Sequence, residues 1–117
     1  APRTTKPARP GDQTWDWVVA IDAEEIYPNL ITQRSLELIA SYEPGRFVAR
    51  IAPTPLLMIL ANGDTQTPYA GQLAAFEGAG EPKKLVTIAG GHYDPYTTSF
   101  DTAAGAARDW FVAHLAP

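Results

Sequence analysis

Two short runs of apolar residues in the second half of the sequence predict two buried β-strands. The first, "LLMILA" at residues 56–61, is apolar at every position, which is typical of a strand covered on both faces. The second run covers residues 84–89. Between them, Pro68 suits the first turn of a helix, and apolar residues follow at helical spacing as far as Gly78 and Gly80. The pattern therefore predicts a strand, a helix and a second strand.

The order of these elements also predicts how the two strands are arranged. A strand–helix–strand unit of this length forms a crossover of nearly fixed handedness, so the strands are expected to be parallel. The loops "NGDTQTP" and "GGHYDPY" then leave the same edge of the sheet, where ligand sites of α/β proteins collect. Strands that pair directly lie roughly 5 Å apart. Asp64 and His92 are therefore expected to meet within hydrogen-bonding reach, roughly 3 Å.

Helical patterns lie on either side of this unit. Residues 30–42 mix apolar and polar positions as an amphipathic helix does. Before them, a short helix is predicted from an N-cap at Thr14 to a stop at Pro28, with a strand as the competing interpretation. Residues 100–115 predict a last helix with Asp101 near its start as a cap and dipole partner. Its apolar stripe comprises Ala103, Ala107, Trp110, Phe111 and Leu115.

Composition and charge narrow the class of protein. A chain of 117 residues, 45% of them hydrophobic, suits one modest domain. Its net charge of −4 and the lack of a basic stripe argue against binding to nucleic acid, and no apolar run is long enough to span a membrane. Without cysteine there is neither a disulfide framework nor a thiolate metal site. We expect a soluble, cytoplasmic protein without a cofactor, whose basic, proline-rich residues 1–13 form an arm or linker.

Asp64 and His92 are the residues with the clearest chemical role. A carboxylate that holds one imidazole nitrogen, while the other faces a nucleophile, is the orienting arrangement of acyl-transfer chemistry. Nucleophile-elbow hydrolases carry serine, acid and histidine in that chain order, and the pair fits the last two places. Ser35, Ser41 and Ser99 all lie outside a G-x-S-x-G motif, and no cysteine replaces them. The nucleophile is therefore expected outside this chain.

The sequence gives weaker support for a chemical role of other residues. Tyr93 and Tyr96 are candidates for binding substrate, with packing against the rim of a pocket as an equal alternative. Asp94 follows His92 closely, but two possible ligands without a third do not predict a metal site, so a bracing role is the alternative. His114 falls in the last turn of the final helix, where a cation complements the helix dipole, and a structural role is preferred.

Three stretches resemble the C-terminal part of an α/β hydrolase of the dienelactone-hydrolase and peptidase S15-like group. They are "PTPLLMILANGDTQTP", "EPKKLVTIAGGHYDPY" and "AARDWFVAHL". The resemblance is clearest over residues 51–115 and extends loosely back through "NLITQRSLELIASYEPG", which is similar to the stretch after that family's lid. It implies an α/β fold with an incomplete sheet of two parallel strands and flanking helices. Asp64 then corresponds to the triad acid and His92 to the triad base.

The resemblance also implies a domain plan and a function. Residues 14–52 correspond to a helical lid-adjacent segment, and residues 53–117 to the C-terminal βαβα part of the hydrolase domain. The expected function is hydrolysis of a small ester, thioester or amide, with Asp64 and His92 serving a serine outside this chain. The chain alone would be inactive, and its partner would be an upstream hydrolase half or a second copy of itself. Because the sequence begins at Ala1 rather than methionine, we expect either a processed product or a fragment.

A different class of protein fits the same features. Two strands make a poor sheet, because the first strand needs a neighbour on its second edge and cover on both faces. A hydrolase remnant without catalytic activity could use that strand edge and the apolar face to bind a partner chain. The alternative hypothesis is therefore a non-catalytic interaction module.

Overall fold

The computed structural model describes residues 12–21 and 31–115. Contacts within the chain divide it into two compact units, residues 1–43 and 44–117. The first unit holds the helices α1 (Asp12–Ile21) and α2 (Gln33–Ser41). The second holds, in order, the 3₁₀ helix η1 (Pro44–Arg50), strand β1 (Leu56–Ala61), helix α3 (Tyr69–Glu77), strand β2 (Lys83–Ile88), the 3₁₀ helix η2 (Asp94–Tyr96) and helix α4 (Phe100–Leu115).

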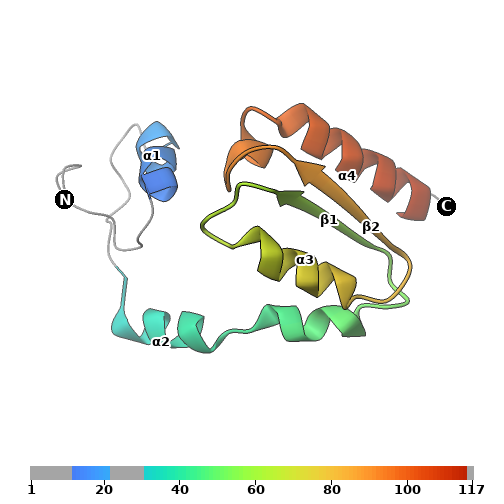
Figure 1. Ribbon diagram of the computed structural model, residues 1–117, viewed down its shortest axis with the longest axis horizontal. Coiled ribbons are helices and arrows are strands. Elements are labelled where there is room, and N and C mark those ends of the chain that lie inside the picture. Colours follow the sequence, from blue (N-terminus) through green and yellow to red (C-terminus); the bar gives the residue numbers. More distant parts are fainter. Residues whose placement is uncertain (1–11, 22–30, 116–117) are drawn as a thin grey trace. The chain divides into compact units, whose positions relative to one another are not determined.

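The two strands of the second unit are parallel neighbours, as predicted. Their register runs from Leu56 opposite Lys83 to Ala61 opposite Ile88, so both strands end together. Helix α3 connects them, and α3 and α4 lie on opposite sides of the strand pair (Figure 1). The prediction of an α/β unit with two parallel strands and flanking helices is therefore confirmed.

Burial is deepest where the strands end. Leu60, Ala61 and Ile88 are buried, while the earlier positions of both strands are half-buried or exposed. Ala79 and Ala103 complete the buried apolar set of the described residues. The most deeply buried part of the unit thus lies directly beneath the loops that carry Asp64 and His92.

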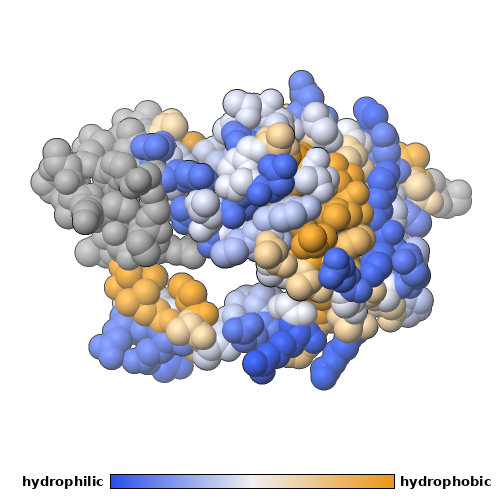
Figure 2. Space-filling view, in the orientation of Figure 1, coloured by the Kyte–Doolittle hydropathy of each residue, from blue (hydrophilic) through white to orange (hydrophobic). Residues whose placement is uncertain are grey.

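The sheet is incomplete within the described residues. It contains β1 and β2 alone, so the outer edge of each strand has no strand partner there. Figure 2 shows apolar surface over the strand pair, in keeping with its partial burial. A continuous apolar run such as "LLMILA" is typical of a strand with neighbours on both edges and cover on both faces. The described chain supplies only part of that environment.

Several helix boundaries differ from the sequence-based expectations. Helix α1 begins at Asp12, so Thr14 lies within its first turn and is not the N-cap, and the stop expected at Pro28 lies outside the described residues. Helix α4 begins at Phe100, so Asp101 lies in the first turn, suited to the dipole but not a cap. Polar residues cluster at such helix starts, and local propensity does not decide which of them caps the helix. The expected arm, residues 1–13, lies outside the described residues except for two residues of α1.

Helix α2 is shorter than the predicted 30–42 and is capped by an unpredicted residue. The Thr32 hydroxyl accepts a hydrogen bond from the backbone N–H of Ser35 at 3.1 Å, the usual N-cap contact. Its large apolar side chains are exposed, and they are Leu36, Leu38 and Ile39. None of the helices in the described part of the chain has the length and apolar character needed to cross a membrane.

Lys83 fastens the start of β2 to the end of α3. Its ammonium donates to the backbone carbonyls of Phe76, Glu77 and Ala79 at 2.9, 3.0 and 2.8 Å. These carbonyls belong to the last residues of α3 and the turn after it, where a helix leaves acceptors without intrahelical donors. The cation also lies 4.8 Å from the centre of the Phe76 ring. This clamp fixes the connection between the helix and the second strand.

The strand pairing continues into the two loops through a close backbone approach. Asn62 N–H donates to Ile88 O at 2.9 Å, and Gly63 N–H donates to Gly90 O at 2.8 Å. A β-carbon built on Gly63 would lie 2.7 Å from Gly90 O, closer than real contacts allow. Gly90 itself has a φ of +133°, a conformation that side-chain-bearing residues rarely adopt. Two glycines are therefore required where the loops leave the sheet.

We predict that Gly63→Ala destabilises the protein by more than about 1 kcal/mol, because the new methyl group must push the two loops apart. Gly71→Ala is the matched control. A β-carbon at Gly71, in α3, would meet no atom within 4 Å, so alanine should raise the free energy of unfolding by roughly 0.5–1 kcal/mol. Urea unfolding of both variants and the unaltered protein checks this. Equal stability of the two variants would contradict the close approach.

Candidate functional site

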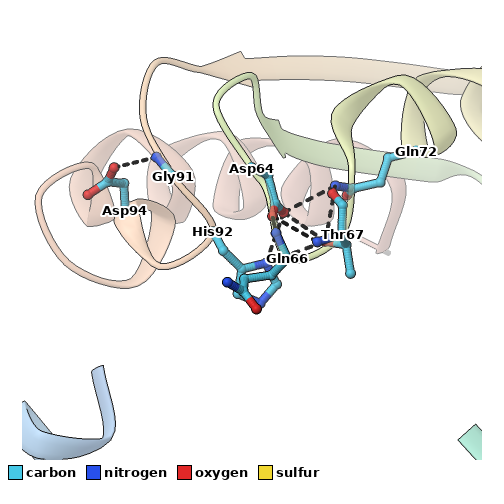
Figure 3. Close-up of polar contacts among 7 residues, drawn as sticks. All are labelled: Asp64, Gln66, Thr67, Gln72, Gly91, His92 and Asp94. Atoms are coloured by element: carbon cyan, nitrogen blue, oxygen red, sulfur yellow. Dashed lines mark hydrogen bonds and ion pairs between the residues drawn. The ribbon is translucent and has the colours of Figure 1, made fainter. Parts of the chain in front are cut away.

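Asp64 and His92 come together at the carboxyl edge of the strand pair. Asp64 lies three residues after the end of β1, and His92 lies four residues after the end of β2. The distance between Asp64 Oδ2 and His92 Nδ1 is 2.8 Å. The prediction that these atoms lie within roughly 3 Å is confirmed. Figure 3 shows the two side chains pointing toward each other from adjacent loops.

Both oxygens of the Asp64 carboxylate accept hydrogen bonds from nearby donors. Oδ1 accepts from the backbone N–H groups of Gln66 and Thr67 at 2.8 and 2.9 Å. Oδ2 accepts from the Thr67 hydroxyl at 2.7 Å and from Gln72 Nε2 at 3.2 Å, in addition to His92. The side chain is only 5% exposed. The carboxylate is therefore held by five donors and has little freedom to rotate.

These contacts decide the charge of Asp64. Burial raises the pKa of the carboxyl group, but the hydrogen bonds from His92, Thr67 and Gln66 outweigh it and lower the pKa from 3.8 to about 2. The carboxylate is therefore ionised at neutral pH and can only accept hydrogen bonds. His92 Nδ1 must then carry the proton of the shared hydrogen bond. In the neutral ring this leaves the lone pair on Nε2, the form needed to accept a proton.

Thr67 and Gln72 belong to the site, although the sequence did not single them out. Gln72 Nε2 also donates to Thr67 O at 2.6 Å and lies 3.2 Å from Thr67 Oγ1, so it ties α3 to the Asp64 loop. The Thr67 hydroxyl also lies 3.4 Å from His92 Nδ1. Aspartate commonly binds backbone N–H groups two or three residues ahead, so "DTQT" carried a local signal for Thr67. Gln72 carried no such signal, because only the packing of α3 brings its amide here.

The two candidate tyrosines lie in different surroundings. Tyr93 packs edge-on against the His92 ring, with 4.7 Å between ring centres. Tyr96 ends η2, is 63% exposed and lies on the wall of a cavity next to the Asp64–His92 pair. The structure thus places Tyr93 against the imidazole and Tyr96 at the cavity.

This cavity has a volume of about 360 Å³ and two chemically distinct parts. Its polar end is formed by Asp64, Thr67, Gln72 and His92. The remaining wall is apolar except for the Tyr96 hydroxyl and comes from β1, η2 and α4: Ile59, Ala61, Pro95, Tyr96, Phe100, Ala103, Ala104 and Ala107. A cavity with a few convergent polar groups beside apolar walls is the usual form of a small-molecule site.

The remaining candidates make contacts of their own. Ser35 and Ser41 belong to α2 in the first unit and make local hydrogen bonds, to Thr32 and to Leu38 O. Ser99 precedes α4, and its backbone N–H donates to Asp94 O at 2.9 Å. His114 lies in the last turn of α4, with its ring 4.0 Å from that of Trp110. Among the described residues, no three side chains of histidine, cysteine, aspartate or glutamate gather as a metal site would require.

The comparisons with known proteins agree with this fold. The crystal structure of the α/β hydrolase GrgF from Penicillium sp. sh18 matches 91% of this chain and 37% of its own, with a TM-score of 0.75 and 26% sequence identity. The polyketide transferase of Gibberella fujikuroi is 36% identical over 67 residues, which are 56% of this chain and 21% of that protein. No family model matches the sequence. The chain therefore has the fold of part of an α/β hydrolase and spans well under half of either protein.

We predict that Thr67→Val raises the pKa of the Asp64 carboxyl group, because it removes the hydroxyl donor at 2.7 Å and leaves the backbone donors in place. Side-chain carboxyl ¹³C NMR measures this pKa directly. Thr65→Val is the matched control, since Thr65 is exposed in the same loop and has no hydrogen bond to Asp64 among the described contacts. An Asp64 pKa unchanged by Thr67→Val would contradict the assigned network.

The lowered pKa of Asp64 also predicts how stability depends on pH. Because the pKa is lower in the folded state, ionised Asp64 stabilises the fold above about pH 4, and this contribution is lost as pH falls toward 2. The contribution is roughly 2 kcal/mol. Between about pH 5 and pH 2, the free energy of unfolding should therefore fall further in the unaltered protein than in Asp64→Asn. Chemical denaturation at several pH values measures these free energies of unfolding. An equal fall in the unaltered protein and in Asp64→Asn would refute the prediction.

Proposed function

We propose that this chain supplies the acid and the base of an acyl-transferring serine hydrolase. The observation that carries the proposal is the 2.8 Å hydrogen bond between the buried, ionised Asp64 and the Nδ1 of His92 at the carboxyl edge of two parallel strands. This is the arrangement in which a carboxylate orients a general base. The dienelactone-hydrolase and peptidase S15-like group is the part of the α/β-hydrolase superfamily that we propose for it.

In the proposed reaction, His92 moves protons and Asp64 does not. Nε2 takes the proton of the nucleophilic hydroxyl as its oxygen attacks the acyl carbon, and the imidazolium then returns that proton to the leaving group. Asp64 stabilises the imidazolium by its negative charge and holds the ring through Nδ1–H. With a pKa of about 2, the carboxylate is a much weaker base than an imidazole, so the proton stays on the ring.

The nucleophile is proposed to come from outside this chain. None of the three serines stands in the strand-to-helix elbow that exposes a nucleophile at the top of an α/β-hydrolase sheet. The outer edge of β1, without a strand partner among the described residues, is where such a neighbour would pair. We propose that an upstream segment supplies the nucleophile and the neighbouring strand. A second copy of the chain is the alternative source. The limited share of each known protein that the chain spans supports the first choice.

The substrate is proposed to be a small ester, thioester or amide with an apolar acyl group. The cavity supports this, because its polar end contains His92 and its long wall is largely aliphatic and aromatic. We propose that Tyr96, on the cavity wall, contacts such a group and that Tyr93, packed edge-on against the His92 ring, supports that ring. The polyketide transferase named above acts on a polyketide by its name, so an acceptor other than water is compatible with the same two residues.

The test compares the chain alone with the chain plus the segment encoded upstream of it in its source. A fluorophosphonate probe reports a reactive serine, and a chromogenic short-chain ester reports turnover. We expect neither signal from the chain alone, because the nucleophile and the oxyanion donors are supplied by the upstream segment. After addition we expect labelling of the added segment and ester turnover. His92→Ala and Asp64→Asn should each lower kcat/KM by about 10³-fold or more.

The control is His114→Ala, which replaces the other histidine and lies at the far end of α4 from the site. It should leave turnover unchanged. Labelling of Ser35, Ser41 or Ser99 in the chain alone would show that the nucleophile is internal and would overturn the proposal. A folded, completed assembly that hydrolyses none of the three substrate types would favour the non-catalytic interaction module instead.

A further inference from the structure

The loop that carries His92 is closed on itself by the side chain of Asp94. The Asp94 backbone N–H donates to Gly91 O at 3.2 Å, and in return the Gly91 N–H donates to Asp94 Oδ2 at 2.6 Å. His92 and Tyr93 are the two residues between these contacts. The backbone on both sides of His92 is therefore held by a single residue. Figure 3 shows the Asp94 carboxylate turned back toward Gly91, while the His92 side chain points to Asp64.

Asp94 also anchors the loop to the start of α4. Its other carboxylate oxygen, Oδ1, accepts from the Thr98 hydroxyl at 2.9 Å. Its backbone carbonyl accepts from the N–H groups of Thr97 and Ser99 at 3.1 and 2.9 Å. Within the described part of the chain, the carboxylate thus bonds to the loop itself and not to Asp64 or the His92 ring. These contacts let Asp94 influence the placement of the imidazole through the backbone.

Gly90 is shaped to accept this carboxylate. A β-carbon at Gly90 would overlap the Asp94 side chain, and the positive φ of Gly90 already disfavours any other residue. The same residue accepts the Gly63 N–H that joins the His92 loop to the Asp64 loop. Asp94, Gly90 and Gly63 therefore form a continuous series of contacts between the turn that carries His92 and the loop that carries Asp64.

We propose that Asp94 is a positioning residue that sets the direction of the His92 ring toward Asp64. The effect of Asp94 on catalysis rests on the proposed function, whereas its effect on the direction of the His92 ring does not. Asp64 is immobilised by its own loop and by Gln72, so the length of the Nδ1–Oδ2 hydrogen bond depends on where the other loop holds His92. Asp94 controls that placement by geometry, through the hydrogen bonds of its side chain to Gly91 and Thr98, and its charge is not required.

Substitutions at Asp94 separate geometry from charge. In Asp94→Asn the amide oxygen can still accept from Gly91 N–H, and the amide nitrogen can donate to the Thr98 hydroxyl, which also serves as an acceptor. Asp94→Ala removes both contacts. Thr98→Val removes only the contact at Oδ1. Asp101→Ala is the matched control. Asp101 is an exposed carboxylate in the first turn of α4, where it suits the helix dipole, and it does not take part in the hydrogen bonds between Asp94 and its neighbours.

The first readout needs no catalytic activity. The His92 Nδ1–H proton, hydrogen-bonded to an ionised carboxylate, gives a downfield ¹H NMR signal that depends on the length of that bond. In the full chain we expect this signal to be kept in Asp94→Asn and Asp101→Ala, to shift in Thr98→Val, and to be lost or strongly shifted in Asp94→Ala. Circular dichroism identifies any variant that unfolds. If Asp94→Ala unfolds, a shifted signal in Thr98→Val together with a kept signal in Asp94→Asn still supports the positioning role. An unshifted signal in Thr98→Val then contradicts it.

The second readout is the division between kcat and KM in the completed enzyme. We expect Asp94→Ala to lower kcat by about 10- to 100-fold with little change in KM, and Asp94→Asn to restore most of it. An Nδ1–H signal unchanged in Asp94→Ala would overturn the positioning role, as would equal losses in Asp94→Asn and Asp94→Ala. Absence of activity in the unaltered assembly would defeat the proposed function alone, because the NMR result stands without it.

Discussion

The parallel pairing of β1 with β2 is the constraint on which the rest of this structure depends. It places Ala61 opposite Ile88 and carries the backbone hydrogen bonding past both strands into the loops. Asp64 lies three residues beyond β1 and His92 four residues beyond β2. The two loops approach each other where Gly63 N–H donates to Gly90 O at 2.8 Å, and Gly90 has a positive φ. The contact between Gly63 and Gly90 therefore joins the two loops whose side chains form the 2.8 Å hydrogen bond between Asp64 and His92.

Asp64 and His92 are held in place by different means. Asp64 is 5% exposed and takes hydrogen bonds from five donors, which compensate for its burial and keep it ionised. His92 is 29% exposed and stands on a turn clasped by Asp94. A rigid anion beside a partly accessible imidazole suits proton transfer, because the ring must reach a reacting group while its tautomer stays fixed.

The limits of the described chain have a physical consequence for the proposed enzyme. The strands are only partly covered, and the cavity beside His92 is walled by β1, η2 and α4. Apolar side chains also remain exposed on α2 and on the last turns of α4, where Phe111 and Leu115 belong to the apolar stripe of that helix. These surfaces resemble a domain core cut open, which agrees with a chain that spans 37% of the hydrolase it matches.

The sequence by itself determined the two parallel strands with their connecting helix, and the meeting of Asp64 with His92. Apolar runs bounded by proline and glycine are local signals, and the handedness of the crossover follows from chain chirality, so the shared edge of the two loops could be derived from them. Only the tertiary structure decided that Gln72 and Thr67 hold the Asp64 carboxylate and that Asp94 clasps the His92 turn. Those roles depend on side-chain directions and on backbone separations of a few ångströms, which residue spacing does not specify.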